Sequence, residues 1–155
     1  MSLTVRQLAP DDVVLLEAML TMFGESFGEP ETYNDARPEP AYLSRLLARD
    51  TFIALAALDD ENVVGGIAAY VLEKFERQRS EIYIYDLAVA EPHRRRGIAT
   101  AMIRELQRIA PRHGAWAVFV QADRGDGPAI ALYSGLGRRE DVLHFDIPVL
   151  APLAK

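Results

Sequence analysis

The stretch AVAEPHRRRGIATAMI, residues 88–103, decides how this chain is interpreted. It places three arginines and a glycine where a helix is expected to begin, in a chain with 23 acidic and 17 basic residues. Positive side chains oppose the positive end of a helix dipole unless an anion lies between them. We therefore predict that a pyrophosphate group binds at the start of this helix.

The residues on either side of the arginines predict how such an anion is held. The preceding decapeptide SEIYIYDLAV, residues 80–89, is rich in β-formers and apolar on both faces, which is typical of a central strand. A strand that ends at Val89, followed by a tight turn and a helix, aims successive backbone N–H groups at one point. Gly97 leaves room for the anion, and an arginine can clamp it bidentately. The alternative is a solvated basic cap that only offsets nearby acids.

Upstream of this region, the chain predicts alternating strands and helices without internal repeats. Residues 51–58 and 63–75 are expected to form a β-hairpin, with Gly65 and Gly66 at a bulge or a close approach. Before the hairpin we expect a strand, a helix that stops at Gly24, a long surface loop and a short helix, over residues 3–8, 13–23, 24–40 and 40–49.

Downstream, the helix that follows the arginines is amphipathic. Its expected inward residues are Ile98, Met102, Leu106 and Ile109. A strand over residues 115–122 comes next, then a helix that begins near residue 126, with Pro128 in its first turn, and ends at Gly137. A last strand is expected over residues 139–147. This order implies an α/β fold in which a mixed sheet carries helices on both faces.

Composition limits the class of protein. A chain of 155 residues with 50% hydrophobic content predicts one domain over residues 1–155. The absence of cysteine excludes disulfides, thiolate metal sites and a covalent cysteine intermediate. No signal peptide and no apolar run of membrane-spanning length is found, so a cytoplasmic protein is expected. The net charge of −6 argues against nucleic-acid and membrane binding and is compatible with a cationic small molecule.

Several familiar site patterns are missing from the sequence. It contains no GxxxxGK[ST] loop, no GxGxxG fingerprint and no GxSxG elbow. The three histidines form no metal pattern, and Asp123, Asp126 and Asp146 lack the spacing of a calcium loop. We therefore expect no metal and neither a nicotinamide nor a flavin cofactor.

Two segments resemble motifs of the GNAT superfamily of acetyl-CoA-dependent N-acetyltransferases. RRRGIA, residues 94–99, matches the pattern [RQ]xxGx[GA], and DGPAIALYSGLG, residues 126–137, resembles NxxAxxLYxxxGF. Asp126 replaces the asparagine of the second pattern, and Arg138 replaces its phenylalanine. The resemblance implies the GNAT acyl-CoA N-acyltransferase fold, with a mixed, mostly antiparallel sheet, a splayed central strand pair and helices on both faces.

The same resemblance implies where acetyl-CoA binds. Its pantetheine arm enters between the splayed strands, and a backbone N–H near Val89 stabilises the oxyanion of the attacked thioester. The expected coenzyme A contacts are Leu87, Ala88, Val89, Arg94, Arg95, Arg96, Gly97, Ile98, Ala99 and Thr100.

Over roughly residues 15–147 the chain looks like the gentamicin-type aminoglycoside 3-N-acetyltransferases, with SEIYIYDLAV as the most specific segment. This closer resemblance implies direct transfer of acetyl, in a ternary complex, to the 3-amino group of deoxystreptamine in an aminoglycoside antibiotic. It also implies a homodimer. Two alternatives are an acetyltransferase of polyamines or protein amines, and an acyl-CoA-binding sensor without turnover.

Asp86 and Tyr133 are the candidate catalytic residues. Asp86 is an acid inside an otherwise apolar strand, where a charge is costly unless it is paired or used. We interpret it as the group that binds the substrate ammonium and accepts its proton; the alternative is an ion pair with Arg79 or another base. By resemblance, Tyr133 protonates the departing thiolate, and the alternative is a core aromatic residue.

Other acids are candidates for the acceptor site. Asp123 follows a strand and Asp126 opens a helix, so both are expected near the cofactor, although capping of the loop explains them equally. The long loop carries further acids that could close over a cation, or that are simply solvated: Glu29, Glu31, Asp35 and Glu39.

Overall fold

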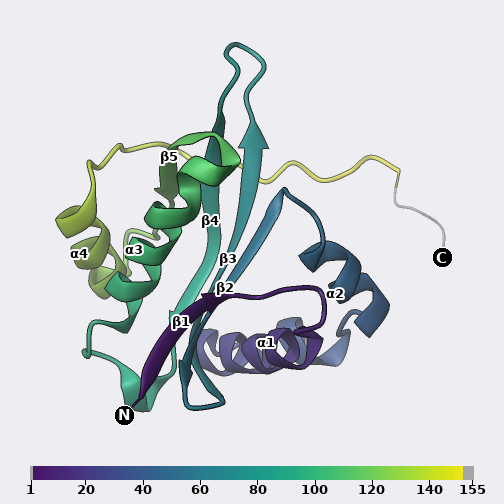
Figure 1. The fold of residues 1–155 in the computed structure, drawn as a ribbon. Coiled ribbons are helices and arrows are strands. Elements are labelled where there is room, and N and C mark those ends of the chain that lie inside the picture. Colours follow the sequence, from purple (N-terminus) through teal and green to yellow (C-terminus); the bar gives the residue numbers. More distant parts are fainter. Residues whose placement is uncertain (1, 152–155) are drawn as a thin grey trace. The chain divides into compact units, whose positions relative to one another are not determined.

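A five-stranded sheet dominates the computed structural model, which describes residues 2–151 (Figure 1). The chain divides into two units, residues 1–121 and 122–155, and the whole sheet belongs to the first. The strands are β1 (Leu3–Gln7), β2 (Phe52–Asp59), β3 (Asn62–Glu73), β4 (Ser80–Val89) and β5 (Ala115–Val120). The expectation of one domain over the whole chain stays a prediction.

The sheet has the order β1-β2-β3-β4-β5. Its pairs are antiparallel except for β4 and β5, which are parallel. A parallel pair needs a crossover connection, and helix α3 (Ile98–Ile109) supplies it. The predicted mixed, mostly antiparallel sheet is therefore confirmed, and β4 is an interior strand with the predicted bounds.

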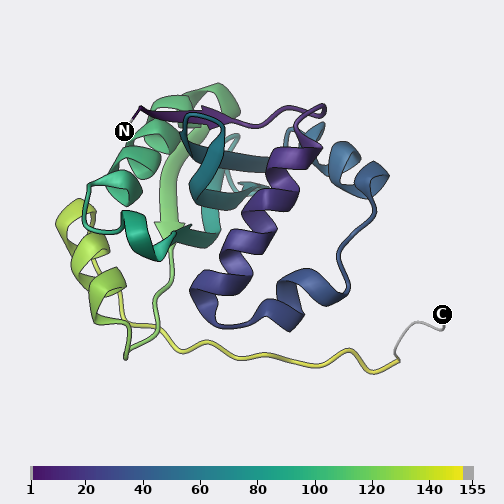
Figure 2. The ribbon, with the colours of Figure 1, turned by 90° about the horizontal axis from the view of Figure 1, so that it is seen from below.

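Helices cover both faces of the sheet, as predicted. Figures 1 and 2 show α1 (Val13–Phe27) and α2 (Pro40–Leu47) on one face and α3 on the other. The four residues of α3 that were predicted from periodicity to face inward are all buried: Ile98, Met102, Leu106 and Ile109. Residues three and four positions apart share one face of a helix, so this apolar face of α3 packs against the core.

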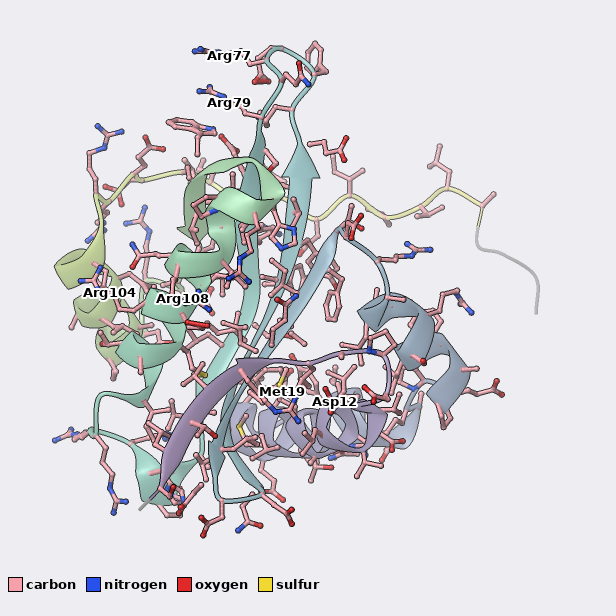
Figure 3. The ribbon with its side chains drawn as sticks, in the orientation of Figure 1. Asp12, Met19, Arg77, Arg79, Arg104 and Arg108 are labelled. Carbon is pink, nitrogen blue, oxygen red and sulfur yellow. The ribbon has the colours of Figure 1, made fainter. Side chains whose placement is uncertain are left out.

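Two adjacent glycines let helices approach β3 from opposite sides. A Cβ on Gly65 would lie 3.2 Å from both Ile98 Cγ2 and Met102 Cε, on the α3 side. A Cβ on Gly66 would lie 2.6 Å from Met19 Cγ and Sδ, on the α1 side; Figure 3 labels Met19. The predicted close approach is confirmed at both glycines, since successive residues of a strand face opposite sides.

The prediction that α1 ends at Gly24 is wrong. The helix continues to Phe27, and Gly28 ends it with a φ of 67°. Gly24 is buried instead, under the segment of residues 30–34, which packs so closely that a Cβ on Gly24 would lie 3.0–3.2 Å from it. Glu31–Asp35 forms a π-helical turn rather than an irregular loop. The helix expected over residues 40–49 ends at Leu47.

The second unit contains helix α4 (Gly127–Leu136). Asp126 precedes it, and its carboxylate accepts a hydrogen bond from the backbone N–H of Ala129 at 3.2 Å. Gly137 follows it, as predicted. The strand expected over residues 139–147 is wrong: the described structure assigns no strand to this segment. Alternating β-formers favour an extended chain, but a strand also needs a neighbouring edge.

Candidate active site

A register shift in β4 shapes the surface of the sheet around Asp86. Along the β3 pairing, Ala69 faces Ile84 and Ala68 faces Asp86, so Tyr85 is an extra residue in β4. Such a bulge re-aims side chains, and bulges are frequent beside active sites. The shift brings the Tyr85 ring and the Asp86 carboxylate to the face of the sheet that α1 and α2 cover.

Strand β5 leaves β4 just before the bulge. The parallel pairing runs from Ser80 and Ala115 to Ile84 and Val120, while β4 continues to Val89. Within the described sheet, residues 85–89 therefore have strand partners on the β3 side only. The predicted splay is present here, and it opens an edge to which an extended ligand can add like a strand.

The chain after β4 is fixed by one of the three arginines. Following a 3₁₀ turn over Glu91–His93, the Arg94 Nε donates a hydrogen bond to the Val89 carbonyl oxygen at 2.9 Å. Arg95 then has a φ of 64° and Gly97 a φ of 77°. The left-handed region costs a residue with a Cβ about 1–2 kcal/mol, so the exposed Arg95 is held in a strained conformation. Strain of this kind points to function at this turn.

The first turn of α3 presents backbone donors. The first bond of the helix runs from the Ala101 N–H to the Gly97 carbonyl oxygen at 3.0 Å, and no described side chain caps this end. A Cβ on Gly97 would meet nothing within 4 Å. The donors that precede the first helical bond are the N–H groups of Ile98, Ala99 and Thr100. With exposed guanidinium groups beside them, they fit an anion.

Asp86 is half-buried, and a tyrosine holds its carboxylate. The Tyr33 hydroxyl donates a hydrogen bond to Asp86 Oδ1 at 3.3 Å. Burial raises the pKa of Asp86, the bond from Tyr33 opposes that rise, and the charge of Glu29 adds to it. Burial of Tyr33 and the nearby charge of Asp86 raise the pKa of Tyr33 to about 12. The phenol therefore keeps its proton and donates the hydrogen bond.

The expected alternative, an ion pair between Asp86 and Arg79, is wrong. Arg79 is the last residue of the turn that joins β3 and β4 (Figure 3). Its guanidinium carbon stacks on the Trp116 ring at 4.0 Å from the centroid. Among the described ion pairs none involves Asp86. The described side-chain hydrogen bond of Asp86 is the one from Tyr33.

A cavity of about 200 Å³ lies beside Asp86, between α1, α2 and the sheet. Its volume is several times the roughly 30 Å³ of one water molecule, so it can admit part of a ligand. Apolar and aromatic side chains make up most of the lining, and Asp86 is the one carboxylate in it. In surroundings of low polarity, this carboxylate favours a cationic group.

Sequence reasoning missed Tyr33. The rings of Phe23 and Phe27 pack against it, at 6.1 and 5.6 Å between centroids. Arg37 ties the π-helical turn to α1 through the Thr21 hydroxyl at 2.9 Å. The four acids predicted to cover an acceptor are all exposed, and Glu29 alone of them affects Asp86 electrostatically. One feature of the sequence could have indicated Tyr33: it is the single tyrosine in the acid-rich segment of residues 24–40.

The remaining candidate residues lie in the second unit. Tyr133 is half-buried on α4, and burial, followed by the charge of Asp126, raises its pKa. Asp126 caps α4, so the structural role considered for it is present. Asp123 is exposed, and its carbonyl oxygen accepts a bond from the Asp126 N–H at 3.0 Å. Roles for the three residues toward a substrate stay predictions.

The described residues contain neither a metal-binding cluster nor a membrane-spanning helix. Across residues 2–151, no group of three His, Cys, Asp or Glu side chains is arranged to hold a metal ion. Among the helices of this described part, none combines the length and the apolar character needed to cross a membrane.

The sequence of residues 16–137, more than half of the chain, matches the Acetyltransferase (GNAT) family. The chain belongs to this family. The splayed strand pair and the open helix start are thus features of a GNAT fold. A curated relative from Bacillus subtilis (strain 168), a prophage-derived uncharacterized N-acetyltransferase, is 30% identical over 106 residues, which are 66% of this chain and 55% of that protein. The chain spans 38% to 55% of the length of the curated relatives that it matches.

Solved structures give closer matches to this GNAT chain. An aminoglycoside acetyltransferase from an uncultured soil metagenomic sample is 61% identical with a TM-score of 0.94, over 96% of this chain and 99% of that one. A second aminoglycoside acetyltransferase from such a sample, in complex with sisomicin, is 31% identical with a TM-score of 0.87, over 95% of this chain and 96% of that one.

Proposed function

We propose that this chain transfers the acetyl group of acetyl-CoA to an amino group of an aminoglycoside. One observation carries the proposal: Asp86 stands on β4 at the point where this strand parts from β5. A carboxylate that can bind an ammonium group is thereby adjacent to a strand edge that can bind a thioester. The start of α3, which fits an anion, follows in the chain within a dozen residues or so.

Coenzyme A is proposed to bind along β4 and at the start of α3. Its pyrophosphate accepts bonds from the N–H groups of Ile98, Ala99 and Thr100, with Arg95 and Arg96 beside them. Its pantetheine amides bond to backbone groups of Leu87, Ala88 and Val89 along the open edge of β4. An N–H near Val89 then bonds to the thioester oxygen as negative charge develops on it, and one such donor contributes about 3 kcal/mol.

The chemistry proposed is direct attack in a ternary complex. The sequence contains no cysteine, so an acetyl-thiol enzyme intermediate cannot form. The amine nitrogen bonds to the thioester carbon, the carbon–sulfur bond breaks, and coenzyme A leaves as a thiolate. Tyr133, from the motif that it occupies, donates a proton to that thiolate.

Asp86 is proposed to accept the proton that the ammonium group loses, directly or through one water molecule. An aspartate of ordinary pKa, about 3.9, is a weak base. Burial raises the pKa of Asp86, which makes its carboxylate a stronger base than an exposed one. The mostly apolar cavity also strengthens its attraction for a cation.

Similarity to two aminoglycoside acetyltransferases supports the choice of substrate, and one of them is 61% identical over nearly the full chain. The net charge of −6 suits a polycationic acceptor. The 3-amino group of deoxystreptamine is proposed from the sequence resemblance, as is a homodimer. Polyamines and protein amines are alternative acceptors, and a cytoplasmic location stays a prediction.

The proposal is tested by following thiol release from acetyl-CoA with gentamicin, spermidine and a basic peptide as acceptors. We expect release with gentamicin at the highest kcat/KM, and loss of release in Asp86→Asn. A higher kcat/KM with spermidine or with the peptide would show that the acceptor is a polyamine or a protein amine and not an aminoglycoside. Binding of acetyl-CoA without release for any acceptor would identify a sensor instead of an enzyme.

A further inference from the structure

Five aromatic rings form a continuous row on one face of the sheet. Neighbouring centroids lie 5.4, 5.9, 5.6 and 4.6 Å apart. The row crosses four strands, from β2 to β5, in this order: Phe52, Tyr70, Tyr85, Tyr83 and Phe119. We call these residues the aromatic row.

The aromatic row begins at the cavity that holds Asp86. Phe52 and Tyr70 line that cavity together with Asp86. Tyr85 directly precedes Asp86, and the bulge turns both side chains to the same face. The carboxylate and the π faces of the rings therefore border one another, and both attract cations.

Part of the aromatic row is open to solvent. Tyr85 is 64% exposed and Tyr70 is 38% exposed, whereas the apolar residues of the sheet interior are buried. Cross-strand aromatic pairs stabilise sheets, which accounts for Tyr70 facing Tyr83 in register. It does not account for Tyr85, because the bulged residue stands outside the ladder and leaves much of its ring uncovered. Exposed rings beside a cavity are typical of a binding surface.

We propose that the aromatic row binds the rings of the amino-sugar acceptor. An ammonium group of the acceptor lies against a tyrosine face, and the C–H face of a saturated ring packs flat on Tyr85 or Tyr70. Asp86 meanwhile holds the amine that is acetylated. This inference rests on the proposed function, and it assigns to the row the discrimination of ring-shaped polycations from linear ones.

Substitutions of Tyr85 test the inference, with KM and kcat measured for gentamicin and for spermidine. Tyr85→Leu keeps a smaller apolar side chain at this position and removes the π face. We expect it to raise KM for gentamicin about tenfold with kcat nearly unchanged, since a desolvated cation–π contact is worth a factor of this order. The rise for spermidine is expected to be smaller, because spermidine has no ring to pack. Tyr85→Phe keeps the ring, so its KM for gentamicin is expected to rise much less than that of Tyr85→Leu.

Phe75→Ala is the matched control. Phe75 is 100% exposed, lies in the turn between β3 and β4, and takes no part in the aromatic row. Its loss is expected to leave both KM values unchanged, and thermal unfolding of each variant is measured to check that it is folded. An unchanged KM for gentamicin in Tyr85→Leu, or an equal rise for both acceptors, overturns the inference while the proposed function stands. A wild-type protein that neither binds nor acetylates gentamicin overturns both.

Discussion

The Tyr33 hydroxyl donates a hydrogen bond to Asp86 Oδ1 at 3.3 Å and so joins a π-helical turn to the bulge of β4. The bond orients the carboxylate and favours its charged form, against the burial that disfavours it. Tyr33 therefore positions Asp86 and lowers its pKa. This relationship couples the segment between α1 and α2 to the proposed base.

Removal of the Tyr33 hydroxyl is predicted to shift the pH dependence of the reaction. Tyr33→Phe keeps the ring that packs on Phe23 and Phe27. Without the bond that favours the carboxylate, the pKa of Asp86 rises further. Because the ionised form of Asp86 is required, the acidic limb of the kcat/KM profile should move to higher pH, with the rate retained on the plateau.

Thr21→Val is the control for this prediction. It removes the acceptor that Arg37 uses to anchor the same turn, but leaves the Tyr33 hydroxyl in place. The lost bond should cost about 1 kcal/mol of stability without moving the acidic limb. Equal pH profiles for Tyr33→Phe and the wild type would show that Tyr33 only packs.

Asp86→Asn is predicted to be inactive but more heat-stable. Loss of the base should lower kcat about 10²- to 10⁴-fold. Since the pKa of Asp86 is raised in the folded state, the wild type loses stability as pH rises through that value, and the neutral amide avoids this loss. The gain in Tm should be present at pH 8 and should shrink near pH 4, where the wild-type carboxyl takes up a proton. A gain that does not depend on pH would contradict this account.

Features of the fold that depend on nearby residues were predictable from the sequence. Periodicity gave the buried stripe of α3, and the bounds of β4 followed from its run of β-formers. Asp126 and Gly137 bracket α4 as expected, because caps are local interactions. The tight turn before α3 was likewise predictable from Gly97, which has a φ of 77°; binding of an anion there stays a prediction.

Features that depend on distant partners were not predictable. Tyr33 and Asp86 are 53 positions apart in the sequence, and no local pattern predicts a hydrogen bond between them. Gly24 resembles a helix stop, yet it is a site where a later segment packs closely on α1. Residues 139–147 have the composition of a strand, but strand formation also depends on a pairing partner, which composition does not specify.

Gly97→Ala is predicted to weaken acetyl-CoA binding. The new methyl group would meet no described atom within 4 Å and would occupy the space in which the pyrophosphate is proposed to lie. The positive φ of 77° adds a backbone cost of about 1–2 kcal/mol. We expect KM for acetyl-CoA to rise about tenfold or more, because an N–H cradle depends on close approach. Steady-state kinetics with acetyl-CoA as the varied substrate measures the effect.

Gly114→Ala is the control that distinguishes backbone strain from loss of acetyl-CoA binding. Gly114 has a φ of 66°, and a Cβ there would also meet nothing within 4 Å. Both variants should therefore lose a similar amount of stability, while only Gly97→Ala raises KM for acetyl-CoA. Equal KM values for acetyl-CoA in the two variants would show that the start of α3 does not bind the pyrophosphate.

Tyr133→Phe is predicted to lower kcat with little change in the affinity for acetyl-CoA. The substitution removes the proton donor proposed for the thiolate and keeps the ring, so its stability effect should be small. The pKa of Tyr133 is raised by burial and by Asp126, which keeps the phenol protonated through neutral pH. Calorimetric titration with coenzyme A and single-turnover kinetics distinguish the two effects. An unchanged rate of the chemical step would remove this role.

Gly66→Ala is predicted to destabilise the fold through a clash with Met19. The new Cβ would lie 2.6 Å from Met19 Cγ and Sδ, so the methionine has to move, at a cost of about 1–3 kcal/mol. Met19→Ala alone should cost about 2–5 kcal/mol, because its side chain is buried. In the double variant the clash is absent, and urea unfolding should give a loss smaller than the sum of the two. Gly125→Ala, where a Cβ meets nothing within 4 Å and no positive φ applies, should leave stability unchanged. Additive losses would show that α1 does not need Gly66 for its close approach to β3.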